Sequence, residues 1–220
     1  MYLFDPVEIQ QNSYAVLGLE LTIDQANQLA KYANLLLKWN SSYNLTSIEQ
    51  PSEVMTLHLM DSLSLVNNLD AVPTEIERVL DVGSGGGLPA IPLAIARPDL
   101  SVSMVDAVQK KIIFLRQCIA ICRLRNVKAF HTRIEKLEEE PFDVITSRAF
   151  ASLSDMVNLT KNLLKPTGYW LAMKGKYPEE EIKVLPDDIE LVKVVPVDIA
   201  NGKFERNLLI LRKKPSLLQV

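Results

Sequence analysis

The sequence predicts an α/β protein built on a doubly wound, mostly parallel sheet, with an N-terminal helical extension and an antiparallel hairpin at the C-terminal edge. Three features predict this fold. Apolar residues recur at helical spacing before residue 74, short apolar runs then alternate with helical segments, and an Asn-Gly pair separates the last two runs. Alternating strands and helices are typical of parallel sheets, whereas Asn-Gly is typical of a turn between antiparallel strands.

The composition is that of one globular domain with a small extension. Of the 220 residues, 48% are hydrophobic and 23% are charged, so the chain can bury a core without disulfides or metal ions. The net charge of −3 excludes a generally basic protein, and any contact with nucleic acid must come from a local patch. Because no stretch approaches the roughly 20 apolar residues of a membrane span and no targeting segment is recognisable, we expect a cytoplasmic protein that does not enter membranes. We also expect a monomer.

Two amphipathic helices are predicted in the N-terminal part. One covers residues 22–39, where Thr22 and Gln25 have the form of a capping box, and the other lies near residues 54–69. No low-complexity linker follows them, so we expect these helices to pack on the sheet. The predicted division is a helical extension, residues 1–74, and a sheet domain, residues 75–220.

The strands of the sheet domain are predicted from short apolar runs. They cover residues 78–82, 101–106, 127–131, 142–147, 169–174, 191–197 and 207–212, with a helix after the first and another over residues 109–124. The second helix carries Cys118 and Cys122 on one face, and the further ligands of a metal site are missing. These cysteines are therefore expected to be buried thiols rather than a disulfide or a metal site.

A glycine-rich turn after the first strand favours a nucleotide cofactor. Gly83, Gly85 and Gly87 permit positive φ and let a ligand approach the backbone closely. A dinucleotide fingerprint requires glycine or alanine where this chain has Leu88, and a phosphate loop requires a lysine followed by serine or threonine. Asp81 before the turn is instead typical of S-adenosyl-L-methionine-dependent methyltransferases, in which such a carboxylate helps to orient the loop and the amino-acid end of the cofactor.

Two further segments complete the predicted cofactor site. Asp106 ends the second strand, where its carboxylate would accept hydrogen bonds from the two ribose hydroxyls. Ile134 and Glu135 follow the third strand, where such folds hold the adenine, although Glu135 also begins an acidic run of surface character. Together these residues predict a Rossmann-like class I methyltransferase sheet with S-adenosyl-L-methionine as cofactor.

A basic stretch marks a candidate RNA-binding surface. Residues 107–134 contain seven basic residues and no acidic one, namely Lys110, Lys111, Arg116, Arg123, Arg125, Lys128 and Arg133. Segregated positive charge in a net acidic chain suits contacts with phosphates, which supply affinity without reading the base sequence. An ordinary solvated helix face accounts for the same charges, so both interpretations stay open at this point.

The segment after the fourth strand narrows the choice of acceptor. Ser147 and Arg148 stand where many methyltransferases of exocyclic amines carry an Asn-Pro-Pro-aromatic motif, and the sheet-end loops offer no cysteine for attack on a pyrimidine. A guanine N7 fits better, because its lone pair is free at neutral pH and no proton has to be removed. Catalysis then rests on positioning, which contributes up to roughly 7–11 kcal/mol, and no catalytic base is expected.

With these residues in view, the chain resembles the RsmG family, also called GidB, from about residue 22 to residue 211. The blocks that carry the resemblance are Lys38-Trp39-Asn40, Tyr43-Asn44-Leu45-Thr46, His58 with Asp61-Ser62, residues 81–85 with Leu88-Pro89 and Ile91-Pro92, Phe114-Leu115-Arg116-Gln117, Ser147-Arg148-Ala149-Phe150-Ala151, Lys174-Gly175, and Arg206. Two positions depart from the usual pattern: Leu57 stands where an arginine is common, and Ala90 where a glycine is frequent.

The resemblance implies methylation of N7 of a guanine in 16S ribosomal RNA of the small (30S) subunit. It implies cofactor contacts at Gly83, Leu88, Ile134, Glu135 and Arg148. It also implies RNA contacts by basic residues around the pocket, with Arg206 a candidate. Together with the basic stretch, the residues predicted to bind RNA are Lys110, Lys111, Arg116, Arg123, Arg148, Lys174 and Arg206. Arg148 suits a cofactor carboxylate or an RNA phosphate, because its planar guanidinium binds either.

Several alternatives stay open at this stage. A small-molecule methyltransferase would use the same cofactor, and a non-enzymatic ribosome assembly factor would bind the cofactor or RNA without turnover. The substrate is naked RNA, an assembly intermediate or the complete subunit. His58 is expected to be buried or to cap a helix, hydrogen-bonded to Asp61, rather than to act as a base. The cluster of Trp39, Tyr43 and Asn44 is either a lid over the cofactor or packing of the N-terminal helices on the sheet.

Overall fold

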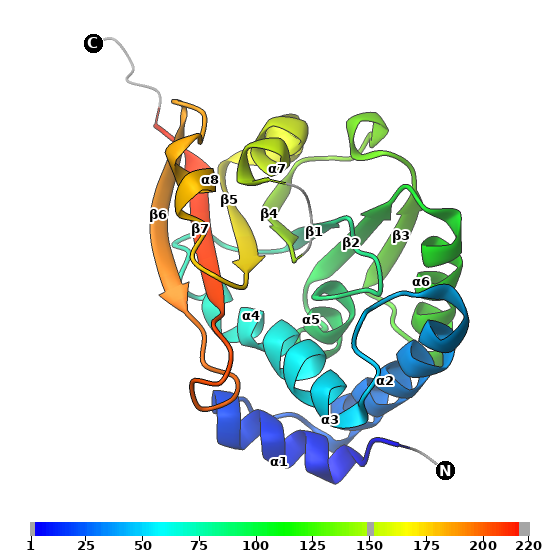
Figure 1. The fold of residues 1–220 in the computed structure, drawn as a ribbon. Coiled ribbons are helices and arrows are strands. Elements are labelled where there is room, and N and C mark those ends of the chain that lie inside the picture. The colour runs from blue at the N-terminus through cyan, green and yellow to red at the C-terminus, as the bar shows by residue number, and fades with distance from the viewer. Residues whose placement is uncertain (1–2, 149–151, 216–220) are drawn as a thin grey trace.

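A seven-stranded sheet forms the centre of the computed structural model, which describes residues 3–148 and 152–215 (Figure 1). Its strand order is β3-β2-β1-β4-β5-β7-β6. The first five strands in this order are parallel, and β7 pairs antiparallel with both β5 and β6. The strands are β1 Arg78–Val82, β2 Ser101–Asp106, β3 Val127–His131, β4 Phe142–Ser147, β5 Leu164–Lys174, β6 Ile189–Pro196 and β7 Asn207–Lys213. The predicted doubly wound sheet with an antiparallel edge hairpin is confirmed.

Helices cover both faces of this sheet (Figure 1). One face carries α1 Pro6–Leu17, α2 Ile23–Tyr43, α3 Pro51–Glu53, α4 Asp61–Leu69, α5 Ala90–Ala96 and α6 Gln109–Cys122. The other face carries α7 Leu153–Thr160 and α8 Glu179–Lys183. None of the described helices combines the length and apolar character that crossing a bilayer requires.

Residues along each strand alternate between two buried apolar clusters. In β1, Val79 belongs to the cluster under the N-terminal helices, whereas Leu80 and Val82 belong to the cluster under α7. Such alternation is dictated by the pleat, since successive side chains of a strand point to opposite faces. A strand buried on both faces therefore needs an unbroken apolar run, which is the pattern that predicted these strands.

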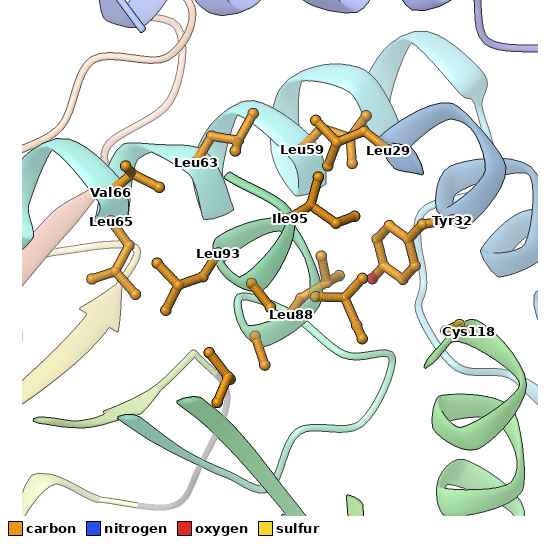
Figure 2. Close-up of a cluster of buried hydrophobic side chains, with 14 of the residues drawn as sticks. Leu29, Tyr32, Leu59, Leu63, Leu65, Val66, Leu88, Leu93, Ile95 and Cys118 are labelled. Atoms are coloured by element: carbon orange, nitrogen blue, oxygen red, sulfur yellow. The ribbon is translucent and has the colours of Figure 1, made fainter. Parts of the chain in front are cut away.

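The N-terminal helices pack on α5 to form the larger part of the core. Figure 2 shows Leu29 and Tyr32 of α2 facing Ile95 of α5, with Leu63 of α4 nearby. These side chains are fully or almost fully buried. Each such large side chain contributes roughly 1.5–3 kcal/mol by leaving water, so this layer is part of the folded unit's stability.

Both predicted N-terminal helices are present. The Thr22 hydroxyl accepts from the Gln25 backbone N–H at 3.2 Å, and the Gln25 side chain accepts from the Thr22 N–H at 2.9 Å, which confirms the capping box. Helix α2 runs beyond the predicted end to Tyr43, where Asn44 ends it with a φ of +49°. The second helix is one continuous segment with α-helical ends, α3 and α4, and a π-helical stretch at Val54–Met60 between them.

Three helices were missing from the prediction. Helix α1 has Asp5 as its N-cap and Gly18, with a φ of +64°, at its end. It buries only Ile9 and Ser13, so its apolar periodicity is weak. The cap residues were the signal from which this helix could have been predicted. Helix α7 begins with a capping box formed by Ser152 and Asp155, and α8 is too short to show a period.

Candidate functional site

The turn after β1 has the backbone that its glycines suggest. Gly83, Gly85 and Gly87 have φ values of +69°, +53° and +82°. A Cβ at Gly87 would lie 2.7 Å from Ile91 Cγ1 and 2.9 Å from Leu115 Cδ2, which is closer than real side chains pack. The turn therefore needs glycine for its conformation and, at Gly87, also for space.

Two cavities of about 490 Å³ and 470 Å³ meet at this turn and share Gly83 and Lys111 in their walls. They lie at the carboxyl ends of β1, β2 and β4, where the strand order reverses direction and open α/β sheets bind their ligands. Further residues of the first cavity include Leu45, Thr46, His58, Asp61, Gly85, Leu88, Arg148, Lys174 and Arg206. Further residues of the second include Asp106, Thr132, Arg133, Ile134 and Glu135.

Asp81 is fully buried beneath the turn, and its main-chain carbonyl accepts from the Ser84 hydroxyl at 2.9 Å. Neither of its carboxylate oxygens has a hydrogen-bond partner among the residues that the structure describes. Burial raises the pKa of the Asp81 carboxyl to about 7, with Ser84 and Arg148 acting in the opposite direction. A buried carboxylate without a partner is costly, and a ligand cation would relieve that cost.

The raised pKa of Asp81 predicts a pH-dependent stability. Between about pH 4 and pH 7 the unfolded chain releases this proton while the folded chain retains it, so stability falls as the pH rises through this window. The full loss is roughly 4 kcal/mol, from about 1.4 kcal/mol per pKa unit. Urea unfolding of the wild type and of Asp81→Asn at pH 5, 6, 7 and 8 measures it. The variant should lack this part of the slope, and equal slopes for the two proteins would contradict the assignment.

Asp106 ties the glycine turn to the start of α6. Its carboxylate accepts from the N–H of Gly85 at 3.0 Å and from the N–H of Val108 at 2.8 Å, and the Lys111 ammonium lies 3.4 Å away. A carboxylate offers about four acceptor positions, so capacity for ligand hydroxyls remains. Lys111, expected among the phosphate-binding residues, thus lies in the wall between the two cavities.

Ile134 and Glu135 form one edge of the second cavity, on a short turn after β3. Ile134 is buried and presents an apolar surface, whereas Glu135 is exposed. The structure thus brings both residues together with Asp106, as the sequence predicted for one end of a nucleotide. Leu88 lies instead in the wall of the first cavity, where it is buried.

Arg148, at the end of β4, is the centre of a polar network in the wall of the first cavity. It donates to the Leu57 carbonyl at 2.8 Å and lies 3.3 Å from one oxygen of Asp61. The Arg206 guanidinium lies 3.5 Å from the other oxygen of Asp61. Burial raises the pKa of the Asp61 carboxyl, and the two arginines oppose this shift. A buried carboxylate thus holds two arginines at the edge of the cavity.

His58 is buried and belongs to the same network. The Arg148 guanidinium lies 3.1 Å from its Nδ1, and Thr46 Oγ1 lies 2.8 Å from its Nε2. Nδ1 also lies 3.0 Å from the Leu57 carbonyl oxygen, so both ring nitrogens have polar partners within the protein. Burial, and then Arg148, lower the pKa of His58 to about 4, so the ring is neutral near pH 7. The expected bond from His58 to Asp61 is wrong, because both side chains bond to Arg148 instead.

The basic residues proposed for RNA fall into two groups. Lys111, Arg148, Lys174 and Arg206 line the first cavity. Lys110, Arg116 and Arg123 lie exposed on α6 or at its end. Lys174 also donates to Glu181 of α8 at 2.8 Å. Ala149, Phe150 and Ala151, which complete the sequence block after β4, lie outside the described residues.

Tyr32 is a site residue that the sequence did not reveal. It is fully buried in α2, and its hydroxyl donates to the Gly86 carbonyl at 2.6 Å. A Cβ at Gly86 would lie 3.1 Å from Leu36, also in α2. The only available signal was the tyrosine itself, because a buried tyrosine hydroxyl needs a polar partner. Helix α2 thus packs directly against the glycine turn.

Comparison with known proteins identifies the family. The model of the family described as "GidB: rRNA small subunit methyltransferase G" matches residues 25–209. Proteins named ribosomal RNA small subunit methyltransferase G from Chromobacterium violaceum and Leptothrix cholodnii are 48% and 45% identical over 88% and 90% of this chain, and the alignments cover 91% of each relative.

Solved structures show the same fold at low sequence identity. A SAM-dependent methyltransferase from Aquifex aeolicus has a TM-score of 0.60 and 19% identity, covering 76% of this chain and 96% of that one. TrmN from Thermus thermophilus has a TM-score of 0.54 and 20% identity, covering 70% and 48%. The Rossmann-like class I methyltransferase fold is thereby established, and on its sequence the chain belongs to the GidB family of rRNA small subunit methyltransferase G.

Proposed function

We propose that this protein transfers a methyl group from S-adenosyl-L-methionine to N7 of a guanine in 16S ribosomal RNA. One observation carries the proposal: two cavities of ligand size meet at the glycine turn, in a chain whose curated relatives are named ribosomal RNA small subunit methyltransferases. The first cavity is the more basic, and the second has the residues that suit a nucleoside.

The two cavities divide the cofactor between them in this proposal. In the second, Asp106 accepts from the ribose hydroxyls, and Ile134 and Glu135 border the adenine. In the first, Gly85 and Arg148 border the amino-acid end, whose carboxylate suits the guanidinium. The buried Asp81 carboxylate beneath the turn supports this placement, since it is a buried acceptor that an ammonium group would satisfy. When bound, the cofactor supplies an electrophilic methyl group.

The acceptor guanine is proposed to enter through the first cavity. Lys174, Arg148 and Arg206 line this cavity, and their positive charges suit the phosphates next to a target base. Neither acid–base candidate of the wall is suited to remove a proton: the lowered pKa of His58, about 4, makes it a weak base with partners at both nitrogens, and Asp61 is held by two arginines. This supports an acceptor such as guanine N7, for which positioning suffices.

The proposal also covers the organisation of the chain. Residues 1–74 are proposed as a helical extension and residues 75–220 as the catalytic domain. Support comes from bonds between them: Gln25 donates to the Ile95 carbonyl at 3.0 Å, and Gln28 donates to the Cys122 carbonyl at 2.8 Å. A monomer acting in the cytoplasm, where small subunits are assembled and used, fits a substrate of this size.

Methyl transfer tests the proposed function. Small subunits from a strain that lacks this activity are incubated with the protein and methyl-labelled S-adenosyl-L-methionine, and the nucleosides are analysed by mass spectrometry. We expect label in 16S RNA as 7-methylguanosine, and none with Gly85→Asp, which places a side chain at a φ of +53° and a second carboxylate next to Asp106. Label no higher than with this control, or label only in another nucleoside, would overturn the proposal. A small-molecule enzyme would show a salt-insensitive activity, whereas RNA binding weakens steeply with salt.

A further inference from the structure

Helices α2 and α6 meet beside the first cavity in a cluster of aromatic and basic side chains. The rings of Trp39 and Tyr43 lie 4.9 Å apart with a tilt of 33°, and the Trp39 ring lies 5.6 Å from that of Phe114. Phe114 is fully buried, whereas Tyr43 is 46% exposed. Trp39 is fixed further by donating to Gln117 at 2.6 Å. Three rings thus lead from the core to the surface, and the outermost is held in place by the second.

The outer ring lies next to the wall of the first cavity. Helix α2 ends at Tyr43, and Leu45, two residues later, lines the cavity. The Lys110 ammonium lies 5.5 Å from the centre of the Tyr43 ring, and the next residue, Lys111, lines both cavities. Tyr43 and Lys110 themselves are in neither wall, so they border the cavity from outside.

The two helices that meet at Tyr43 carry mainly positive charge. Helix α6 has no acidic residue, and the acidic residue of α2 is Asp24, in its first turn and far from Tyr43. Lysines and arginines are spread along the same two helices at Lys31, Lys38, Lys110, Lys111 and Arg116. An exposed aromatic ring among cations is the combination with which proteins bind single-stranded nucleic acid.

Of the two interpretations of this cluster, the structure supports packing for Trp39, whereas the Tyr43 ring contacts Trp39 and stays 46% exposed. Trp39 is half-buried against Phe114 and hydrogen-bonded. Tyr43 covers neither cavity, so it is not a lid over the cofactor in this structure.

We propose that Tyr43 and Lys110 form a stacking platform for an unpaired RNA base that flanks the methylated guanine. This inference rests on the proposed function. The flanking base stacks on the Tyr43 ring, and the Lys110 ammonium moves from the ring to the adjoining phosphate. The proposal therefore requires that the RNA is unpaired at this position, with the base next to the target guanine exposed for stacking.

Binding of small-subunit RNA and of the cofactor, measured separately, tests the platform. Tyr43→Ala should weaken RNA binding by roughly 5- to 150-fold, the effect of losing one base–aromatic stack. Tyr43→Phe, which keeps the ring, should stay within about twofold of the wild type. Affinity for S-adenosyl-L-methionine and the unfolding midpoint should be unchanged in both. RNA binding by Tyr43→Ala within twofold of the wild type would overturn the platform, and so would a loss of cofactor affinity with RNA binding intact, the result expected of a lid.

Salt dependence separates the two residues of the platform. Lys110→Gln should lower the slope of log affinity against log salt by about one, whereas Tyr43→Ala should leave the slope unchanged. An unchanged slope in Lys110→Gln would contradict the phosphate contact. These measurements follow binding and need no methyl transfer. If the wild type binds RNA but forms no 7-methylguanosine, the proposed function is contradicted, whereas the platform is still tested by the binding data.

Discussion

Replacing Gly87 by alanine is expected to lower affinity for S-adenosyl-L-methionine and methyl transfer by at least about 100-fold. The residue has a φ of +82°, and the added Cβ would lie 2.7 Å from Ile91 Cγ1 and 2.9 Å from Leu115 Cδ2. The left-handed conformation costs roughly 1–2 kcal/mol, and overpacking adds roughly 1–3 kcal/mol. Both neighbours are fully buried, so the strain is relieved most readily by a shift of the turn itself.

Gly202→Ala is the matched control for this variant. Gly202 has a similar φ of +76°, but a Cβ there meets nothing within 4 Å, and the residue lies in the loop between β6 and β7. It should lose roughly 1–2 kcal/mol of stability and keep full cofactor affinity. Calorimetric titration and urea unfolding of both variants measure the two effects. Cofactor affinity in Gly87→Ala equal to that of the control would show that the turn does not bind this ligand.

Arg148→Met is expected to remove nearly all activity and to lower stability by roughly 3–5 kcal/mol. The stability loss follows because Asp61 stays buried and, among the residues that the structure describes, keeps only Arg206, 3.5 Å away, as a charged partner. His58 also loses its contact with the Arg148 guanidinium. The activity loss, of about 100-fold or more in kcat/KM, follows if the guanidinium holds the cofactor carboxylate or an RNA phosphate, as proposed.

The double variant Arg148→Met/Asp61→Asn separates these two effects. Removing the buried negative charge should recover much of the lost stability but none of the activity. Unfolding free energies and kcat/KM for the two single variants and the double variant complete the cycle. If activity recovered together with stability, Arg148 would serve only to neutralise the buried Asp61 and would not bind the cofactor or RNA.

The parts of the fold that were predictable are those with a local signal. The five parallel strands and the hairpin follow from apolar runs and turn residues, and the glycine turn follows from its spacing. Helix α1 was missed because it buries so few side chains that no apolar period develops. Hydrophobic periodicity reveals a helix or a strand only when one of its faces buries several apolar side chains.

The candidate site was less predictable, because its contacts join distant parts of the chain. We expected a bond between His58 and Asp61, but Arg148, the residue after β4, contacts both. Tyr32, which donates to the Gly86 carbonyl, lies in α2, 54 residues earlier in the sequence. The sequence shows the charge of Lys111 but not that its side chain turns toward Asp106 rather than outward. Such directions are set by packing between elements, for which no local pattern exists.

A crystal structure of the protein with S-adenosylhomocysteine, the demethylated cofactor, tests the central claim most directly. The account predicts the ribose hydroxyls on the Asp106 carboxylate, the adenine beside Ile134 and Glu135, and the amino-acid end beside Gly85 and Arg148. Ligand density elsewhere on the molecule, or a ribose that makes no contact with Asp106, would contradict it.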